Sequence, residues 1–202
     1  ARDAWRREVI DGLLKRMDVL SPLAADVGTR AEFAETAAAR STGVADRDWQ
    51  RTIAAIRVAP AYVGLDIGPQ LDLIPLGRDA NSGFFEFWHF PTGARPVFDD
   101  DRESWIVGPE TGIIFVLVPG GRFTMGSQTK DEDLPNHDPQ AFEASVTTEV
   151  TLDPFFIAKH EVTQGQWRRF TGQNPSWYRD GTRTRVTYTL AHPVERVSWN
   201  DA

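Results

Sequence analysis

The sequence predicts an α+β fold, a helical segment followed by a β-rich unit, and two changes near residue 60 support this prediction. Residues 1–58 place apolar side chains at helical spacing, whereas from Pro60 onward Gly and Pro recur with short extended runs between them. The charge changes as well: residues 1–58 hold ten basic and nine acidic residues, and residues 59–202 hold 12 and 20. We therefore divide the chain into a helical N-terminal segment, residues 1–58, and a second domain, residues 59–202.

Three short helices are expected in the N-terminal segment. The first carries one apolar stripe and ends at Ser21-Pro22; the stripe consists of Trp5, Val9, Leu13, Met17 and Leu20. A capping box formed by Thr29 and Glu32 opens the second helix, which we expect Gly43 to close. Asp46 is the expected cap of the third, which stops before Pro60 and whose buried face consists of Trp49, Ile53 and Ile56.

Six strands are expected in the second domain, at residues 71–76, 84–90, 113–118, 122–125, 146–152 and 155–160. The run FFEFWHF at 84–90 has aromatic residues on both faces, which is typical of a strand that is buried on both sides. Pro119-Gly120-Gly121 is expected to be a tight turn in which glycine supplies a positive φ, so that 122–125 returns as the second strand of a hairpin. Residues 126–145 are expected to form a long polar loop.

The stretch LDPFFIAKHEVTQGQWRRF, Leu152 to Phe170, is expected to be a strand that leads directly into a capped helix. Thr163 stands at the N-cap and Gln166 three residues later completes a capping box, while Gly172 follows at the C-terminal end. Trp167 and Phe170 are expected to form the core-facing side of this helix.

Composition excludes several classes of protein. The chain has no Cys, which rules out disulfides, a zinc–thiolate site and a cysteine nucleophile, and 41% apolar residues suffice for a core. No apolar run approaches the length of a membrane span and no signal-peptide pattern is present. Because residues 59–202 are acidic, a nucleic-acid partner is not expected. Residues 179–185, RDGTRTR, are basic but broken by Gly and Thr, and we interpret them as a solvated loop.

No catalytic, cofactor-binding or metal-ligating residue is assigned from the sequence. The acidic loop residues depart from a calcium-binding loop because Asn136 and Phe142 occupy the template positions of Gly and Glu; the loop residues are Asp131, Asp133, Asn136 and Asp138. His89 is interpreted as a packed, hydrogen-bonded histidine, and the four histidines have no metal-binding spacing. Trp177-Tyr178 is consistent with a binding surface or with aromatic packing inside a loop, and both interpretations stay open.

Three blocks occur in one order along the chain: FVLVPGGRFTMGS at 115–127, DPFFIAKHEVTQGQW at 153–167 and HPVERVSWNDA at 192–202. Together they resemble the formylglycine-generating enzyme, or sulfatase-modifying factor, family. The run at 69–96 is similar to a segment that precedes this domain in large multidomain bacterial members. The resemblance covers residues 69–202 and implies a C-type-lectin-like fold that is incomplete at its C-terminal end, so we expect the chain to be a fragment.

The resemblance also implies two functional expectations. Members of the family are copper-dependent oxidases that convert a sulfatase cysteine to formylglycine; their copper-binding cysteine pair and their calcium sites lie beyond the last residue of this chain. We therefore expect copper and calcium only in a complete parent domain, and no catalysis by this chain. The alternative is a non-catalytic, lectin-like domain of a multidomain bacterial signalling protein that binds a ligand, a protein or a peptide. A cytoplasmic location is favoured.

Overall fold

The computed structural model describes residues 31–142, 146–182 and 185–201. The helix expected within residues 1–20, and Thr29 of the second capping box, lie outside these residues. Residues 31–38 are helical and continue into the π-helical turn η1 (Ala39–Val44), followed by α2 (Asp46–Val58) and α3 (Gln164–Thr171); the 3₁₀ turns are η2 (Pro60–Tyr62) and η3 (Phe90–Thr92). The strands are β1 (Leu73–Arg78), β2 (Phe85–His89), β3 (Val97–Asp99), β4 (Ser104–Ile106), β5 (Ile113–Val118), β6 (Gly121–Met125), β7 (Thr148–Leu152) and β8 (Phe155–Ala158).

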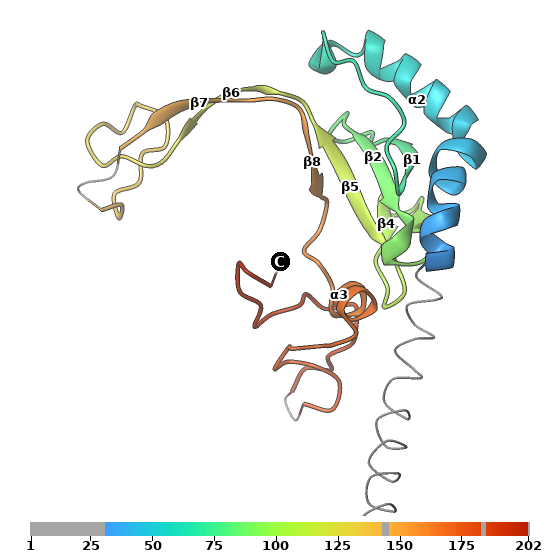
Figure 1. Cartoon of the computed structure of the whole chain (residues 1–202). Coiled ribbons are helices and arrows are strands. Elements are labelled where there is room, and N and C mark those ends of the chain that lie inside the picture. Colours follow the sequence, from blue (N-terminus) through green and yellow to red (C-terminus); the bar gives the residue numbers. More distant parts are fainter. Residues whose placement is uncertain (1–30, 143–145, 183–184, 202) are drawn as a thin grey trace, which may run out of the picture.

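The strands form one antiparallel sheet and two separate ribbons, so the described part of the chain is α+β, as predicted. The sheet has the order β1-β2-β5-β8, while β3 pairs with β4 and β6 pairs with β7. Figure 1 shows α2 along the sheet and the β6–β7 ribbon reaching away from it. No helix among the described residues is long and apolar enough to cross a bilayer.

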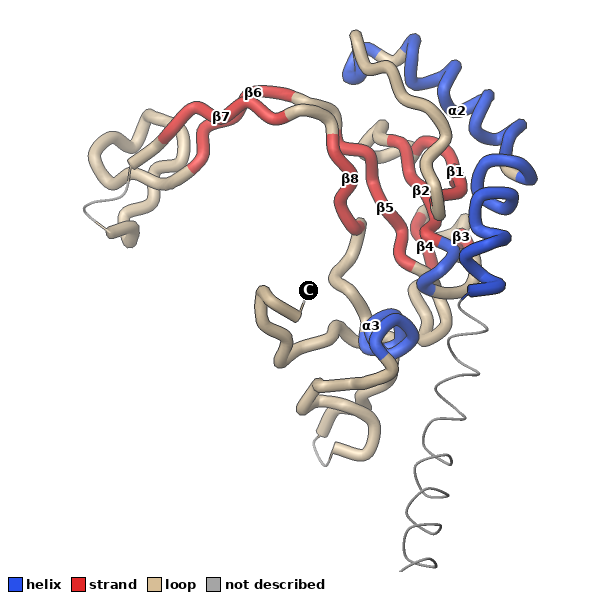
Figure 2. Tube along the Cα trace, viewed as in Figure 1, coloured by secondary structure: helices blue, strands red, loops and turns tan. Residues whose placement is uncertain are grey.

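Helix α2 runs along the sheet (Figure 2), and the two share one hydrophobic core. Trp49 is 0% exposed, stacks on Phe87 of β2 with 5.3 Å between ring centroids, and donates its indole N–H to the carbonyl of Ser41 at 2.9 Å. Tyr62 donates its hydroxyl to the carbonyl of Leu117 in β5 at 2.6 Å. The boundary at residues 58 and 59 therefore falls inside a common core, and residues 31–58 pack as part of the same body as the sheet.

The start of α2 differs from the expected cap. Ala45, rather than Asp46, is the N-cap residue and makes no side-chain cap hydrogen bond, because the π-helical turn runs into α2 with a single non-helical residue between them. Gly43 lies inside that turn instead of closing the helix before it. Asp46 sits in the first turn of α2, where its carboxylate accepts a hydrogen bond from Gln50 at 2.7 Å and faces the positive end of the helix dipole.

The predicted hairpin of strands 113–118 and 122–125 is wrong. Strand β6 pairs with β7, and the partner of β5 on that side is β8. Neither Gly120 nor Gly121 has a positive φ. The glycine at 120 is required by proximity instead, since a Cβ there would lie 2.8 Å from the carbonyl oxygen of Leu152 and 2.9 Å from Cδ of Pro154.

Helix α3 has the predicted caps but a different buried face. Thr163 accepts a hydrogen bond from the backbone N–H of Gln166, whose side chain accepts one from the N–H of Thr163, and Gly172 adopts the left-handed conformation with φ 78°. The buried residues of the helix are Gln164, Gly165 and Gln166. Trp167 is only half-buried and Phe170 is 65% exposed, so the expected apolar core face is not formed within the described residues.

The buried face of α3 is polar, and burial of this face is tolerated because its side-chain amides have hydrogen-bond partners. The Gln166 side-chain amide donates to the carbonyl of Thr111 at 3.0 Å, and the Gln164 amide donates to the carbonyl of Tyr178 at 2.8 Å. Gly165 permits this close docking, since a Cβ at that position would lie 2.3 Å from the carbonyl oxygen of Pro109. Helix α3 thereby fixes the loop that follows it.

Candidate binding site around Trp177

The loop 174–182 is held by side chains on both sides of it. Asn174 donates its amide to Oε1 of Gln164 at 2.9 Å, which ties the loop to α3. On the other side, one carboxylate oxygen of Glu195 accepts hydrogen bonds from the backbone N–H groups of Trp177 and Tyr178. These two hydrogen bonds to one carboxylate oxygen fix the backbone at Trp177, and they therefore fix the point from which its side chain extends.

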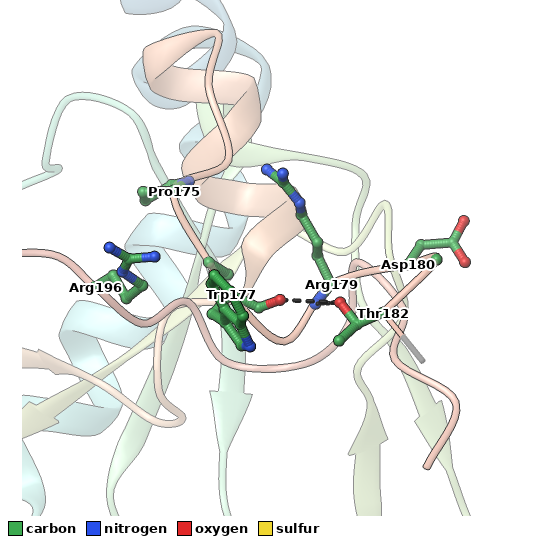
Figure 3. Close-up of a pocket in the computed structure, with 8 residues that line it drawn as sticks. Pro175, Trp177, Arg179, Asp180, Thr182 and Arg196 are labelled. Carbon is green, nitrogen blue, oxygen red and sulfur yellow. Dashed lines mark hydrogen bonds between the residues drawn. The ribbon is translucent and has the colours of Figure 1, made fainter. Parts of the chain in front are cut away.

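Trp177 forms the wall of a pocket of about 480 Å³. Figure 3 shows Trp177 between Arg196 and the loop residues Arg179, Asp180 and Thr182. Trp177 is 62% exposed, and the Arg196 guanidinium lies 5.8 Å from its ring centroid, a cation–π distance. The Thr182 hydroxyl donates to the carbonyl of Trp177 at 2.9 Å and closes the loop.

The pocket combines an aromatic surface with positive charge. Its lining holds Arg179, Arg196 and Asp180, a net charge of +1 within a chain of net charge −7. Arg179 donates from Nη1 to the carbonyl of Asn174 at 3.2 Å and so has a defined position. An exposed indole beside guanidinium groups suits a flat or apolar group that carries a carbonyl or carboxylate, as peptides do.

The sequence left two interpretations open for Trp177-Tyr178, a binding surface and aromatic packing inside a loop, and each fits one of the two residues. Trp177 lines the pocket, whereas Tyr178 packs its ring 5.3 Å from that of Tyr188, which in turn lies 5.3 Å from His192. Part of the basic run 179–185 lines the pocket through Arg179, so that run is more than a solvated loop. Glu195 and Arg196 were not identified as site residues from the sequence, because no spacing pattern links them to a loop 18 residues earlier.

The family resemblance implies copper and calcium in a complete domain, and the described residues of this chain were compared with the ligands that those metals need. There is no Cys to supply the thiolate that selects Cu(I), and the described residues contain no cluster of three or more His, Asp or Glu side chains. In the acidic loop, the buried amide of Gln128 holds the backbone through hydrogen bonds. Its Oε1 accepts from the N–H groups of Lys130 and Asp131, and its Nε2 donates to the carbonyl of Asp131 at 2.6 Å.

Two of the four histidines have shifted pKa values with identifiable causes. His89 is half-buried, its Nδ1 lies 3.3 Å from the hydroxyl of Thr92, and its ring packs edge-on to Phe115, which confirms the prediction of a packed, hydrogen-bonded histidine. Burial lowers the pKa of His89, and the Asp72 carboxylate opposes that shift. Burial, reinforced by the charge of Lys159, also lowers the pKa of His160. Neither histidine lines the Trp177 pocket.

Comparison with known proteins identifies the domain to which the pocket belongs. Residues 109–202 match the family model of the sulfatase-modifying factor enzyme 1-like domain. The chain is also 40% identical over 83 residues to the chaperone protein LppX of Paenibacillus barcinonensis, a match that covers 39% of this chain and 26% of that protein. The chain thus spans about a quarter of the curated relative it matches, and no solved structure matches it significantly. Residues 69–108, part of the initial resemblance, lie outside the matched domain, whereas the three blocks that carried the resemblance all fall within residues 109–202, which match the model of the sulfatase-modifying factor family.

Proposed function

We propose that residues 109–202 form the N-terminal part of a C-type-lectin-like, formylglycine-generating-enzyme-type domain and provide it with a polypeptide-binding surface. The Trp177 pocket is the contact point. The observation that carries this proposal is the exposed indole, which is held in place from its own backbone by Glu195 and flanked by Arg196. Exposed Trp and Arg are the residue types that dominate binding energy at protein surfaces.

Two similarities support a polypeptide as the ligand. Residues 109–202 match a sulfatase-modifying factor domain, and the resemblance implies that such a domain acts on a cysteine within a sulfatase polypeptide; LppX is named a chaperone. A modifying enzyme and a chaperone differ in chemistry, but both must hold a segment of another protein. Polypeptide binding is therefore the function that is consistent with both relationships.

The chain itself is proposed to be non-catalytic. The oxidation of a sulfatase cysteine in this family depends on a copper–thiolate site, and this chain has no thiolate to offer. The alternative, a lectin-like domain of a multidomain bacterial signalling protein, has no separate observation in its favour. If a complete parent protein is an oxidase, its copper ligands come from residues other than these.

The proposal is tested by fluorescence anisotropy with a dye-labelled, cysteine-containing sulfatase peptide as the probe. The 202-residue chain should bind the peptide, and Trp177→Ala should weaken binding about tenfold to thirtyfold, the loss typical of a central aromatic contact. Trp199→Ala is the matched control, because Trp199 is 93% exposed and does not line the pocket.

Circular dichroism of both variants would confirm that they retain the fold. Equal affinities of the Trp177 and Trp199 variants would contradict the assignment of the pocket. A chain that folds but does not bind the peptide at all would contradict the proposed function.

A further inference from the structure

A second pocket lies between the end of the β1–β2 pair and the β3–β4 ribbon. Its volume is about 360 Å³, within the range of small-ligand sites of about 300–1,000 Å³. One wall comes from residues 76–81 and Glu86, and the other from the ribbon residues Phe98, Asp100, Glu103 and Trp105. All of these residues precede residue 109, so this pocket lies outside the domain that matches the family.

The aromatic wall of this pocket is fixed in position. Phe98 and Trp105 are cross-strand partners in the ribbon, and their rings meet edge-on with 4.9 Å between centroids. The Trp105 indole N–H donates to Oε2 of Glu86, which ties the ribbon to β2. The register of β1 shifts by a bulge between Pro75 and Gly77, and Gly77 is the partner of Glu86 in β2. No atom lies within 4 Å of the position that a Cβ at Gly77 would occupy.

Most charged side chains around the pocket already have hydrogen-bond or ion-pair partners within the protein. Glu86 is 3% exposed, and its Oε1 pairs with the ammonium of Lys159. Asp79 accepts hydrogen bonds from the backbone and hydroxyl of Ser82 and lies 3.9 Å from the same ammonium. Arg78 donates from Nε to the carbonyl of Gly83 at 2.7 Å.

Two carboxylates that line the pocket have no such partner. Asp100 and Glu103 have no side-chain hydrogen bond or ion pair to any residue in the described part of the chain. With Asp79 and Glu86 they make four carboxylates against two cations, Arg78 and Lys159, so the lining and its immediate neighbours carry a net charge of −2. The pocket therefore presents negative charge beside a fixed aromatic wall.

We propose that this pocket binds a guanidinium group, that of an arginine side chain in an extended peptide. A guanidinium stacks on an aromatic face and donates several hydrogen bonds to carboxylates, so it matches both parts of the lining. Asp100 and Glu103 are exposed at the rim, and the pocket volume and the Phe98–Trp105 wall distinguish this site from a flat acidic surface. This site is independent of the Trp177 pocket, and its test does not involve that pocket.

The test uses the full chain, labelled with ¹⁵N, and follows the indole N–H signal of Trp105 by nuclear magnetic resonance. The probes are the acetylated and amidated peptide Gly-Arg-Gly and the same peptide with citrulline, a neutral analogue of nearly the same shape, in place of arginine. The signal is assigned by its loss in Trp105→Phe. The arginine peptide should shift this signal in a saturable way, and the citrulline peptide should not.

Variants then separate a specific site from general attraction to an acidic protein. The double variant Asp100→Asn, Glu103→Gln should weaken binding about tenfold or more, because it removes both unpaired carboxylates. Asp101→Asn removes one negative charge from the same turn but not from the lining, and should change affinity by less than about twofold. Binding of the citrulline peptide, failure of the arginine peptide to bind, or equal effects of the two charge changes would each overturn the proposal.

Discussion

At the scale of single residues, Glu195 determines the geometry of the Trp177 pocket without lining it. Its carboxylate accepts the N–H groups of two successive loop residues, and its own N–H donates to the hydroxyl of the fully buried Ser176 at 3.2 Å. The next residue, Arg196, has φ 62°, a left-handed conformation that is uncommon for a side chain of this size. Glu195 thus positions the loop while Arg196 contacts the indole.

Trp49 is the residue whose loss should cost the most stability. It is fully buried, stacks on Phe87 and donates a hydrogen bond to Ser41, so Trp49→Ala should lower the free energy of unfolding by about 3–5 kcal/mol in urea denaturation. Trp167→Ala should cost less than this, because Trp167 is only half-buried. The exposed Trp199→Ala should stay within about 0.5 kcal/mol of the parent chain. A smaller loss at Trp49 than at Trp167 would contradict the observed core.

His89 should make stability depend on pH in a predictable direction. Burial lowers the pKa of His89 in the folded chain, so the unfolded chain binds the proton first as pH falls. The contribution is fully present above the unfolded pKa of about 6.5 and is lost as pH falls through that value toward the folded pKa. His160, whose pKa is also lowered, acts in the same direction.

The measurement is the urea midpoint of the parent chain and of His89→Gln at pH 8.5, 7.5 and 5.5. The parent should lose stability between pH 7.5 and 5.5, and the variant should lose less. Between pH 8.5 and 7.5, where His89 is neutral in both states, the parent and the variant should change equally. A variant with the same loss as the parent below pH 7.5 would show that His89 does not carry the effect.

Local signals were predictable from the sequence, whereas the docked face of α3 was not. The capping box of Thr163 and Gln166 is a short-range pattern of hydrogen-bonding side chains, and it is present in the structure. The burial of Gln164 and the exposure of Phe170 depend on carbonyl groups of distant segments, among them Tyr178. Apolar periodicity contains no information about such acceptors, so it selected the wrong face.

At the scale of elements, the junction between the sheet and the β6–β7 ribbon explains the failed hairpin prediction. Gly120 does not reverse the chain; it passes close to Leu152 and Pro154, where β7 leads into β8. Two pairs of strands, β5 with β8 and β6 with β7, are thus continuous across this junction. A sequence with two glycines after a strand favours a hairpin locally, and only the long-range pairing decides against it.

This junction yields a matched pair of substitutions. Gly120→Ala places a methyl group 2.8 Å from the Leu152 carbonyl oxygen and should lower the free energy of unfolding by about 1–3 kcal/mol. Gly121→Ala meets no atom within 4 Å and has no positive φ, so it should be neutral or slightly stabilising, by up to about 1 kcal/mol. Urea denaturation distinguishes the two, and equal effects would show that Gly120 is not at a close approach.

At the scale of the whole molecule, the sequence identified the family blocks and offered Trp177 as a binding residue, but it did not identify the residues that complete either pocket. The match over residues 109–202 supports the resemblance that those blocks indicated. Both pockets, however, join segments that are separated along the chain: Trp177 with Arg196, and Glu86 with Trp105. Likewise, the change in composition near residue 60 predicted two units, whereas α2 and the sheet share a core. Composition indicates the secondary structure of a segment, whereas its packing partner depends on contacts with distant segments.

Native mass spectrometry tests at once whether this chain binds a polypeptide and whether it leaves that polypeptide unoxidised, as we propose. The chain is incubated in air with copper and a cysteine-containing sulfatase peptide, then analysed beside a control without protein. We expect a one-to-one complex that contains the unmodified peptide. Conversion of the cysteine to formylglycine above the control would contradict the proposed non-catalytic role, and a correctly folded chain that forms no complex would contradict polypeptide binding.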